Sequence, residues 1–219
     1  MTEPLEETIR SYDSHAQAYA RRFAAAEMTR EQELFAVRLP RRSRPVLDAG
    51  CGAGRDFRGF RLLGVEPIGV DLSAGLLTEA RRCADASLIQ ADMLRLPFRA
   101  VSFRGVWCCA SLMHLTPPQA AMALREFRRT LTDDGVLFVL VREGNIPGRR
   151  ATSWRDRTGR WFHPYDREAM EQLLQSAGFT VVHDAVLSRP HVGRWIGLLA
   201  VVSPDTGSSR RRAAGAAES

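Results

Sequence analysis

The residues best suited to hold a ligand lie in one stretch, Val46 to Gly54, where an acid, Asp48, precedes three glycines at alternate positions. The apolar residues Val46 to Ala49 predict a short buried strand. Glycines directly after a strand let the backbone turn tightly and come close to a ligand, because they lack a Cβ atom. Apolar residues from Phe57 to Leu63 then predict a helix. A helix N-terminus after such a turn offers free N–H groups, so the stretch predicts a site for a nucleotide-like ligand.

A dinucleotide-binding fingerprint is one candidate for this stretch, and its spacing argues against it. That fingerprint has its third glycine three positions after the second, where this chain has Arg55, whereas its own third glycine is Gly54. The order Asp-x-Gly-x-Gly-x-Gly instead resembles motif I of the class I S-adenosylmethionine-dependent methyltransferases. Under this resemblance four residues of the turn bind the cofactor: Asp48, Gly50, Cys51 and Gly52.

Two more acids follow apolar segments farther along the chain. Asp71 ends the predicted strand Pro67 to Val70, about 20 residues beyond the glycines, where an acid can accept hydrogen bonds from a ribose diol. Asp71 can equally cap the helix predicted from 74 to about 84, and the two roles are compatible. Asp92 ends a strand predicted near 87–91. In the family, an acid and a hydrophobic residue at this place hold the adenine, and the backbone after the fourth strand lies against the methionine arm. The resemblance therefore assigns five further residues to the cofactor: Asp71, Leu72, Asp92, Met93 and Cys109.

The N-terminal residues 5 to about 38 are predicted to be helical, with a break near 24–28. Tyr12 and Tyr19 are seven positions apart and so share one helix face. Residues 12–19 resemble the Tyr-Asp-x-x-Ala-x-x-Tyr helix that covers the cofactor in many small-molecule methyltransferases. The resemblance implies that Tyr19 reaches the cofactor carboxylate, and we assign Tyr12 to the acceptor. The alternative is that both tyrosines only pack on the domain.

One histidine follows the predicted fourth strand, Phe103 to Ala110. His114 resembles a histidine that is common here in the family, which makes it the first candidate for a general base. A base is needed only if the acceptor must lose a proton, and a packed structural histidine is the alternative. The same strand departs from the family at Arg104, where an acid is usual.

A long segment without a regular pattern, residues 142–165, follows the predicted fifth strand. Its arginines and aromatic residues suit a planar or anionic acceptor. The family builds its acceptor pocket here, so Trp161, His163 and Tyr165 are predicted to bind the acceptor, with the last two following His114 as candidate bases. A solvent-exposed loop without a binding role is the alternative. The other arginine and aromatic residues of segment 142–165 are Arg149, Arg150, Trp154, Arg155, Arg157, Arg160 and Phe162.

Seven candidate strands alternate with helices, which predicts an α/β fold with a doubly wound, seven-stranded, mostly parallel sheet. The resemblance adds the strand order 3-2-1-4-5-7-6 of the Rossmann-like methyltransferase fold, with an antiparallel final hairpin. We expect an N-terminal helical lid (1–40), a cofactor-binding domain (41–203) that includes the acceptor loop, and a disordered tail (204–219). The later elements are predicted as a helix over 117–131, a turn at 132–135, a strand over 136–141, a helix from 166, and strands near 180–182 and 195–202.

Composition narrows the class of protein. The chain has 219 residues, of which 45% are hydrophobic, and a formal net charge of +6. Its four cysteines form no C-x-x-C pair, which predicts a reduced protein without a structural metal. No apolar run reaches the roughly 20 residues of a membrane span, and the N-terminus lacks a signal-peptide pattern, so we expect a cytoplasmic protein. The basic charge is compatible with an anionic substrate or with nucleic acid.

Together these features predict an S-adenosylmethionine-dependent methyltransferase that acts on a small-molecule acceptor, anionic or aromatic in character, by direct in-line transfer. An RNA (tRNA) methyltransferase is the first alternative, although no appended RNA-binding domain is recognisable. A non-catalytic partner protein with the same fold is the second. A dehydrogenase comes last because of Arg55.

Overall fold

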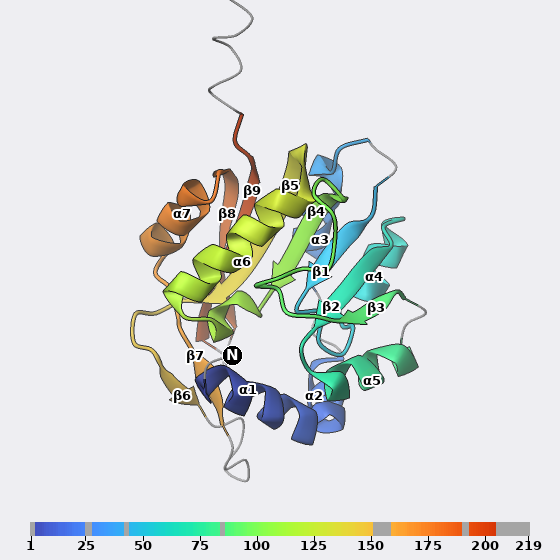
Figure 1. Cartoon of the computed structure of the whole chain (residues 1–219), viewed down its shortest axis with the longest axis vertical. Coiled ribbons are helices and arrows are strands. Elements are labelled where there is room, and N and C mark those ends of the chain that lie inside the picture. Colours follow the sequence, from blue (N-terminus) through green and yellow to red (C-terminus); the bar gives the residue numbers. More distant parts are fainter. Residues whose placement is uncertain are drawn as a thin grey trace, which may run out of the picture.

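One mixed sheet runs through the structure (Figure 1). The structure is a computed structural model that describes residues 3–24, 28–41, 44–83, 86–150, 159–189 and 193–204. Within these ranges seven strands form the sheet, in the order β3-β2-β1-β4-β5-β9-β8. β1 to β5 are parallel, and β9 is antiparallel to both of its neighbours. β8 and β9 are the sixth and seventh strands of this sheet, because β6 and β7 form a separate pair. The predicted fold class and strand order are therefore confirmed. The strands are β1 Val46–Ala49, β2 Pro67–Asp71, β3 Leu88–Gln90, β4 Phe103–Cys109, β5 Leu131–Arg142, β8 Phe179–Arg189 and β9 Gly193–Val202.

Helices cover both faces of this sheet. Figure 1 shows α6 and α7 in front of the strands and α3 behind them. One buried cluster includes Leu124 of α6, and a second, on the opposite face, includes Phe35 of α3 and Phe60 of α4. Trp107 of β4 anchors the second cluster, because its ring stacks on Phe138 at a centroid distance of 4.1 Å. The helices are α1 Glu3–Ser14, α2 Ala16–Phe23, α3 Thr29–Arg38, α4 Phe57–Leu62, α5 Ala74–Cys83, α6 Pro117–Thr130 and α7 Arg167–Ser176, with a short 3₁₀ turn, η1, at Leu112–His114.

The start of β5 differs from the prediction. The sequence predicts a turn at 132–135, but these residues lie inside the strand. Phe103 of β4 pairs with Leu131, and Gly105 pairs with Val136, so four residues of β5 bulge opposite one residue of β4. A bulge lets polar residues leave the ladder while the apolar residues on either side keep their partners. The predicted turn is therefore wrong, and its residues form an irregularity within a longer strand.

The N-terminal helical segment is divided at His15, so the predicted helix is confirmed with one extra break. α1 is attached to α5 through Asp13, the acid of the tyrosine-containing pattern. Its Oδ1 atom accepts hydrogen bonds from the Ser73 hydroxyl at 2.6 Å and from the Gly75 N–H at 2.9 Å. Because these donors lie at the N-terminus of α5, an acid there is also favoured by the helix dipole. The contact fixes α1 over the ends of the parallel strands.

The segment after β5 contains a small hairpin, β6 (Gly148–Arg150) and β7 (Arg160–Phe162), where the sequence predicts an irregular loop. Figure 1 shows this hairpin beside α1. The Trp161 backbone N–H donates to the Thr8 hydroxyl at 3.0 Å, and its indole N–H donates to Glu7 at 2.9 Å. Several residues named in the sequence analysis lie outside the described part of the chain, namely Trp154, Arg155, Arg157 and the tail from 205.

The described residues also bear on the expectations about membranes, metals and cysteines. No helix within the described ranges is long and apolar enough to cross a bilayer. The same residues contain no group of three or more His, Cys, Asp or Glu side chains that could hold a metal ion. Cys108 and Cys109 are buried in β4, as their apolar surroundings predict.

Candidate cofactor and acceptor site

A cavity of about 480 Å³ lies between the carboxyl ends of the parallel strands and the helices α1 and α2. Ligands of open α/β sheets bind at this edge, where loops and helix N-termini converge. Eleven of the predicted site residues line the cavity: Tyr12, Tyr19, Gly50, Cys51, Gly52, Asp71, Leu72, Asp92, Met93, Cys109 and His114. The structure does not bring the other four, Asp48, Trp161, His163 and Tyr165, to the cavity wall.

The glycine turn after β1 forms part of the wall. Gly50 has a φ of 77°, a conformation that glycine adopts without strain. A Cβ atom at Gly50 would overlap Ser111 Cβ and lie 2.6 Å from Ser111 Oγ. The Ser111 hydroxyl donates to the Ala49 carbonyl at 2.8 Å, so the segment after β4 is held directly against the turn. The close approach of the Ser111 segment to the turn therefore requires that Gly50 carry no side chain.

Asp71, at the end of β2, is held by two backbone donors. Its Oδ2 accepts the Gly52 N–H at 2.8 Å, and its Oδ1 accepts the Ser73 N–H at 2.9 Å. Each oxygen keeps a lone pair for a further hydrogen bond, which suits the two hydroxyls of a ribose. Burial raises the pKa of this carboxyl, and the N–H groups of Ser73 and Gly52 counteract part of that shift. Asp71 can therefore cap the start of α5 and bind a ligand at the same time, as the sequence allows.

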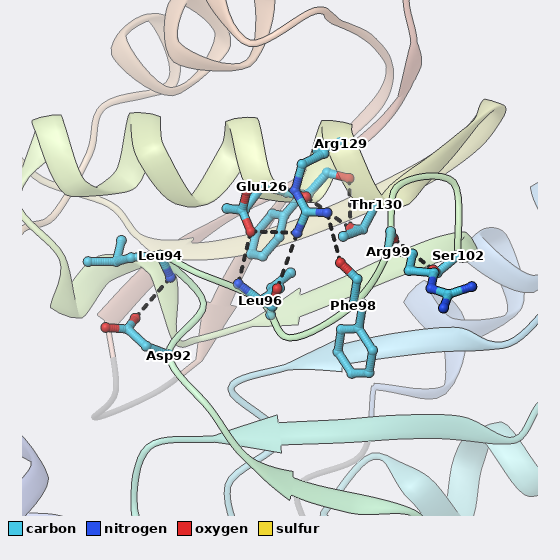
Figure 2. Close-up of polar contacts among 10 residues, drawn as sticks. Asp92, Leu94, Leu96, Phe98, Arg99, Ser102, Glu126, Arg129 and Thr130 are labelled. Carbon is cyan, nitrogen blue, oxygen red and sulfur yellow. Dashed lines mark hydrogen bonds and ion pairs between the residues drawn. The ribbon is translucent and has the colours of Figure 1, made fainter.

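Asp92, just after β3, has one carboxylate oxygen engaged. Oδ1 accepts the Leu94 N–H at 2.9 Å, and the other oxygen makes no hydrogen bond to the described residues (Figure 2). Met93 lines the cavity beside it. A free carboxylate oxygen next to an apolar side chain complements the amino group and the flat face of an adenine. The pair can therefore hold the base of a nucleoside.

A buried group of charges lies next to the glycine turn. Arg55 donates to both oxygens of Asp56, at 2.9 and 2.7 Å, and the Trp107 indole N–H donates to the same carboxylate at 2.9 Å. Arg55 also lies 3.0 Å from Cys109 Sγ and lines the cavity. Asp48 is buried, and its Oδ2 has no hydrogen-bond partner among the described residues. Burial and the nearby Asp56 raise the pKa of Asp48 well above its usual range, and the Arg55 guanidinium counteracts part of that shift.

Tyr12 and His114 meet in the cavity although they are 102 positions apart in the chain. The Tyr12 hydroxyl lies 2.9 Å from His114 Nε2, and His114 Nδ1 lies 2.7 Å from the Trp161 carbonyl. Because a carbonyl only accepts, Nδ1 carries the proton and Nε2 accepts from Tyr12. Burial lowers the pKa of His114 to about 4, so the ring is neutral at pH 7. A neutral imidazole with so low a pKa holds the hydroxyl firmly but is a weak general base.

Three of the four residues predicted to bind the acceptor lie away from the cavity wall and contact other parts of the chain. The Trp161 indole is bonded to Glu7, as described above. The His163 backbone N–H donates to the Met113 carbonyl at 2.7 Å, next to η1. Tyr165 is buried in the main core, and burial raises the pKa of its hydroxyl to about 12. These contacts attach the hairpin segment to α1 and η1.

Arg160 of β7 is buried among aromatic rings. Its guanidinium carbon lies 4.7 Å from the ring centroid of Tyr12, 5.5 Å from that of Tyr19 and 5.8 Å from that of Phe162. The residue is only 9% exposed, and its Nε has no hydrogen-bond partner within the described ranges. No carboxylate of the described chain forms an ion pair with it. The guanidinium therefore lies against ring faces, directly behind two residues that line the cavity, Tyr12 and Tyr19.

Sequence patterns assign no separate role to Arg55 or Arg160. Arg55 directly follows the third glycine, so its place in the motif is a usable signal for a side chain at the cavity. Arg160 is one of several arginines in its segment, and only its burial distinguishes it from the others. Burial of one arginine among many depends on tertiary contacts, and no local pattern marks it.

A family model described as "Methyltransferase domain" matches residues 46–135 of the chain, which include the glycine turn and all three strand-end acids. A protein of Encephalitozoon cuniculi that is named as a methyltransferase is 34% identical over 63% of this chain and 70% of its own length. The malonyl-acyl-carrier-protein O-methyltransferase of Enterobacter lignolyticus is 37% identical over 58% of this chain, and the match spans about half of that relative's length.

Two solved structures share the fold. The 1,6-didemethyltoxoflavin-N1-methyltransferase of Burkholderia thailandensis, crystallised with S-adenosylhomocysteine, has a TM-score of 0.73 and 22% identity, and the match covers 93% of this chain and 92% of that one. The cyclase SpnF has a TM-score of 0.63 and 21% identity, with 80% of each chain covered. A methyltransferase and a cyclase with one architecture illustrate that a shared fold does not define the reaction. With the sequence relatives and the matched domain added to the fold and the site, the chain belongs to the class I S-adenosylmethionine-dependent methyltransferase family of enzymes.

Proposed function

We propose that the protein methylates a small-molecule acceptor by direct in-line transfer, with α1 and α2 acting as a lid over both substrates. The observation that carries this proposal is that one cavity of about 480 Å³ is lined by two of the strand-end acids, Asp71 and Asp92, and by the Tyr12–His114 pair. Cavities of a few hundred Å³ enclose ligands of drug size. The acceptor and the cofactor would then share one enclosed space, from which α1 excludes water.

The residues that line the cavity fit S-adenosylmethionine. Asp71 offers two acceptors for a ribose, and Asp92 with Met93 offers an acceptor and an apolar surface for an adenine. We assign Tyr19 and Arg55, two of the polar side chains that line the cavity, to the amino-acid end. When bound, the cofactor supplies a methyl group on a sulfonium, an electrophile with a neutral leaving group. The chain then has mainly to hold the acceptor atom in line, which requires positioning rather than a covalent intermediate.

We assign the acceptor side to Tyr12 and His114. His114 orients the Tyr12 hydroxyl through Nε2, and its own ring is fixed by the Trp161 carbonyl. His114 thus supports the site in the neutral form, and we assign it the positioning of Tyr12 rather than the removal of a proton from the acceptor. Trp161, His163 and Tyr165 are proposed to shape the acceptor end indirectly, since Trp161 holds the hairpin against α1, His163 is bonded to η1 and Tyr165 is packed in the core.

The methyl-transfer experiment that tests this function can be run before the acceptor is identified. Formation of S-adenosylhomocysteine would be followed with pools of small carboxylates, phenols and amines, and with tRNA as a separate sample. We expect turnover with at least one small molecule and none with tRNA at low salt. Turnover with tRNA only, weakening steeply as salt is added, would instead identify an RNA methyltransferase.

Replacing Asp71 by alanine should weaken binding of S-adenosylhomocysteine by about 1–3 kcal/mol, because two charge-assisted hydrogen bonds to the ribose are lost. Calorimetric titration of the purified variant measures the change. Asp166→Ala is a matched control, because it also removes an acid at a helix N-terminus but lies outside the cavity. Equal affinities of the wild-type protein and the Asp71 variant would remove this residue from the cofactor site.

The buried cation Arg160 supports an acceptor that carries an anionic group. A guanidinium without an anionic partner is costly to bury, and a bound anion near Tyr12 would repay part of that cost. We expect Arg160→Gln to raise KM about 10-fold for an anionic acceptor and to leave KM unchanged for its neutral methyl ester or amide. Arg160→Lys, which keeps the charge, should recover part of the loss. A uniform change for charged and neutral acceptors would show that Arg160 is only structural.

A further inference from the structure

The segment between β3 and β4, residues 91–102, connects the cofactor side of the cavity to the last turn of α6. Ala91, Asp92 and Met93 line the cavity, whereas the residues that follow do not. The segment contains no helix or strand, so its backbone groups need partners elsewhere. Five of these backbone groups, all within residues 96–102, find their partners at the C-terminal end of α6.

Two side chains of α6 bind the backbone of this segment (Figure 2). Glu126 accepts the Leu96 N–H at 2.9 Å. Arg129 donates to the Phe98 carbonyl at 2.8 Å and to the Leu96 carbonyl at 3.2 Å. The two side chains also bind one another in a bidentate pair, at 2.8 and 2.7 Å. One ionic pair therefore satisfies the backbone on both sides of Pro97.

The end of the segment is attached to the same turn of the helix. The Val101 N–H donates to the Arg129 carbonyl at 3.0 Å, and the Ser102 N–H donates to the Thr130 carbonyl at 2.7 Å. These carbonyls belong to the last turn of α6, where they have no partner within the helix. The segment and the end of α6 thus complete each other's hydrogen bonds.

Hydrogen bonds, rather than charge attraction, give this attachment its strength. Arg129 is 37% exposed at its side chain, so water screens the attraction between the two charges. The hydrogen bonds from Arg129 lower the pKa of Glu126, which keeps the carboxylate ionised and able to accept from Leu96. The planar guanidinium reaches two carbonyls and one carboxylate at once, a geometry that lysine cannot reproduce.

We propose that Glu126 and Arg129 are positioning residues for adenine recognition, because they fix the backbone four residues beyond Asp92. Asp92 Oδ1 is bonded to Leu94 N–H, so the direction of its free oxygen depends on where residues 94–96 lie. Because Leu96 is anchored to α6, the free carboxylate oxygen of Asp92 is restricted to a narrow range of orientations. The proposal rests on the assignment of Asp92 to the adenine amino group. It adds that selectivity for this amino group depends on residues that never touch the cofactor.

The test compares two forms of the spent cofactor by calorimetric titration. S-adenosylhomocysteine carries the 6-amino group, and S-inosylhomocysteine has a carbonyl in its place. We expect the wild-type protein to prefer the adenosyl compound and Arg129→Gln to reduce that preference about 10-fold, since a misplaced carboxylate no longer distinguishes the two bases. Arg128→Gln is the matched control, because Arg128 lies one position earlier on α6 and pairs with the exposed Asp133. Its preference should equal that of the wild-type protein.

A purely structural role predicts a different result, namely a lower melting temperature for Arg129→Gln with an unchanged preference, and that result would overturn the proposal. If this variant does not fold, Glu126→Gln serves in its place, because its amide can still accept from Leu96 but no longer forms the ionic pair. Asp92→Asn separates the role of the acid from that of the α6 pair. An unchanged preference in Asp92→Asn removes the adenine assignment itself, whereas a loss there without a loss in Arg129→Gln removes only the role of the α6 pair.

Discussion

Gly50→Ala is expected to destabilise the fold by about 3 kcal/mol or more and to remove measurable binding of S-adenosylhomocysteine. Two costs add at this position. The backbone is in the left-handed region, with a φ of 77°, where a side chain is strained. The added methyl group would also overlap Ser111 Cβ, which is held in place by its bond to Ala49. Relief requires the turn or the segment after β4 to move, and both line the cavity.

Gly64→Ala is the matched control for this prediction. Gly64 has a φ of 68°, and a Cβ atom there would meet nothing within 4 Å. Its cost should therefore be only the backbone strain of about 1–2 kcal/mol, with cofactor binding unchanged. Urea unfolding and calorimetric titration of both variants give the comparison. Equal destabilisation of the two variants would mean that the contact with Ser111 costs nothing.

The second large effect is a loss of stability on acidification that depends on His114. The folded protein holds the pKa of this ring at about 4, below the ordinary value of 6.5, because the ring is buried and because the positive charge of Arg160 opposes protonation. The unfolded chain therefore takes up a proton at a higher pH than the folded one. The contribution of His114 to the free energy of unfolding is fully present above pH 6.5 and decreases as the pH is lowered toward 4. In total it amounts to about 3 kcal/mol.

Comparison with His114→Asn isolates this contribution from other titrating groups. Asparagine can keep a donor and an acceptor at this place but does not titrate. Free energies of unfolding measured from pH 8 to pH 4 should show the wild-type protein losing its advantage over the variant between about pH 6.5 and 4. If the difference between the two proteins stayed constant across that range, His114 would not be the buried neutral ring described here.

Much of the fold could be predicted from the sequence because the relevant signals are local. The short apolar run before Gly50 predicts a buried strand, and the later strands of the seven-stranded sheet are also marked by apolar runs, whereas β6 and β7 are not. Pro117 at the start of α6 and Gly178 after α7 mark their helix ends in the expected way. The bulge at 132–135 was not predicted, because acidic residues next to a glycine have the composition of a turn whether or not the strand continues past them.

Most of the residues on the proposed cofactor side of the cavity could also be predicted from the sequence. Residues at the carboxyl ends of adjacent parallel strands must lie near one another, so Asp71 and Asp92 converge wherever this sheet forms. Asp48 obeys the same rule, but it is buried and does not line the cavity. The sequence places an acid at the strand end, and only the packing decides whether that acid faces the cavity or the interior.

The acceptor side depended on the tertiary structure. Tyr12 and His114 are 102 positions apart, and Arg160 reaches Tyr12 from a hairpin strand still farther along the chain. Contacts over such separations arise from the docking of α1 on α5 and on β7, and no spacing within the sequence encodes them. The sequence by itself determined the sheet, its order and the cradle for an adenosyl group. Which side chains line the proposed acceptor side of the cavity, and which arginine is buried behind them, was decided only when distant segments packed together.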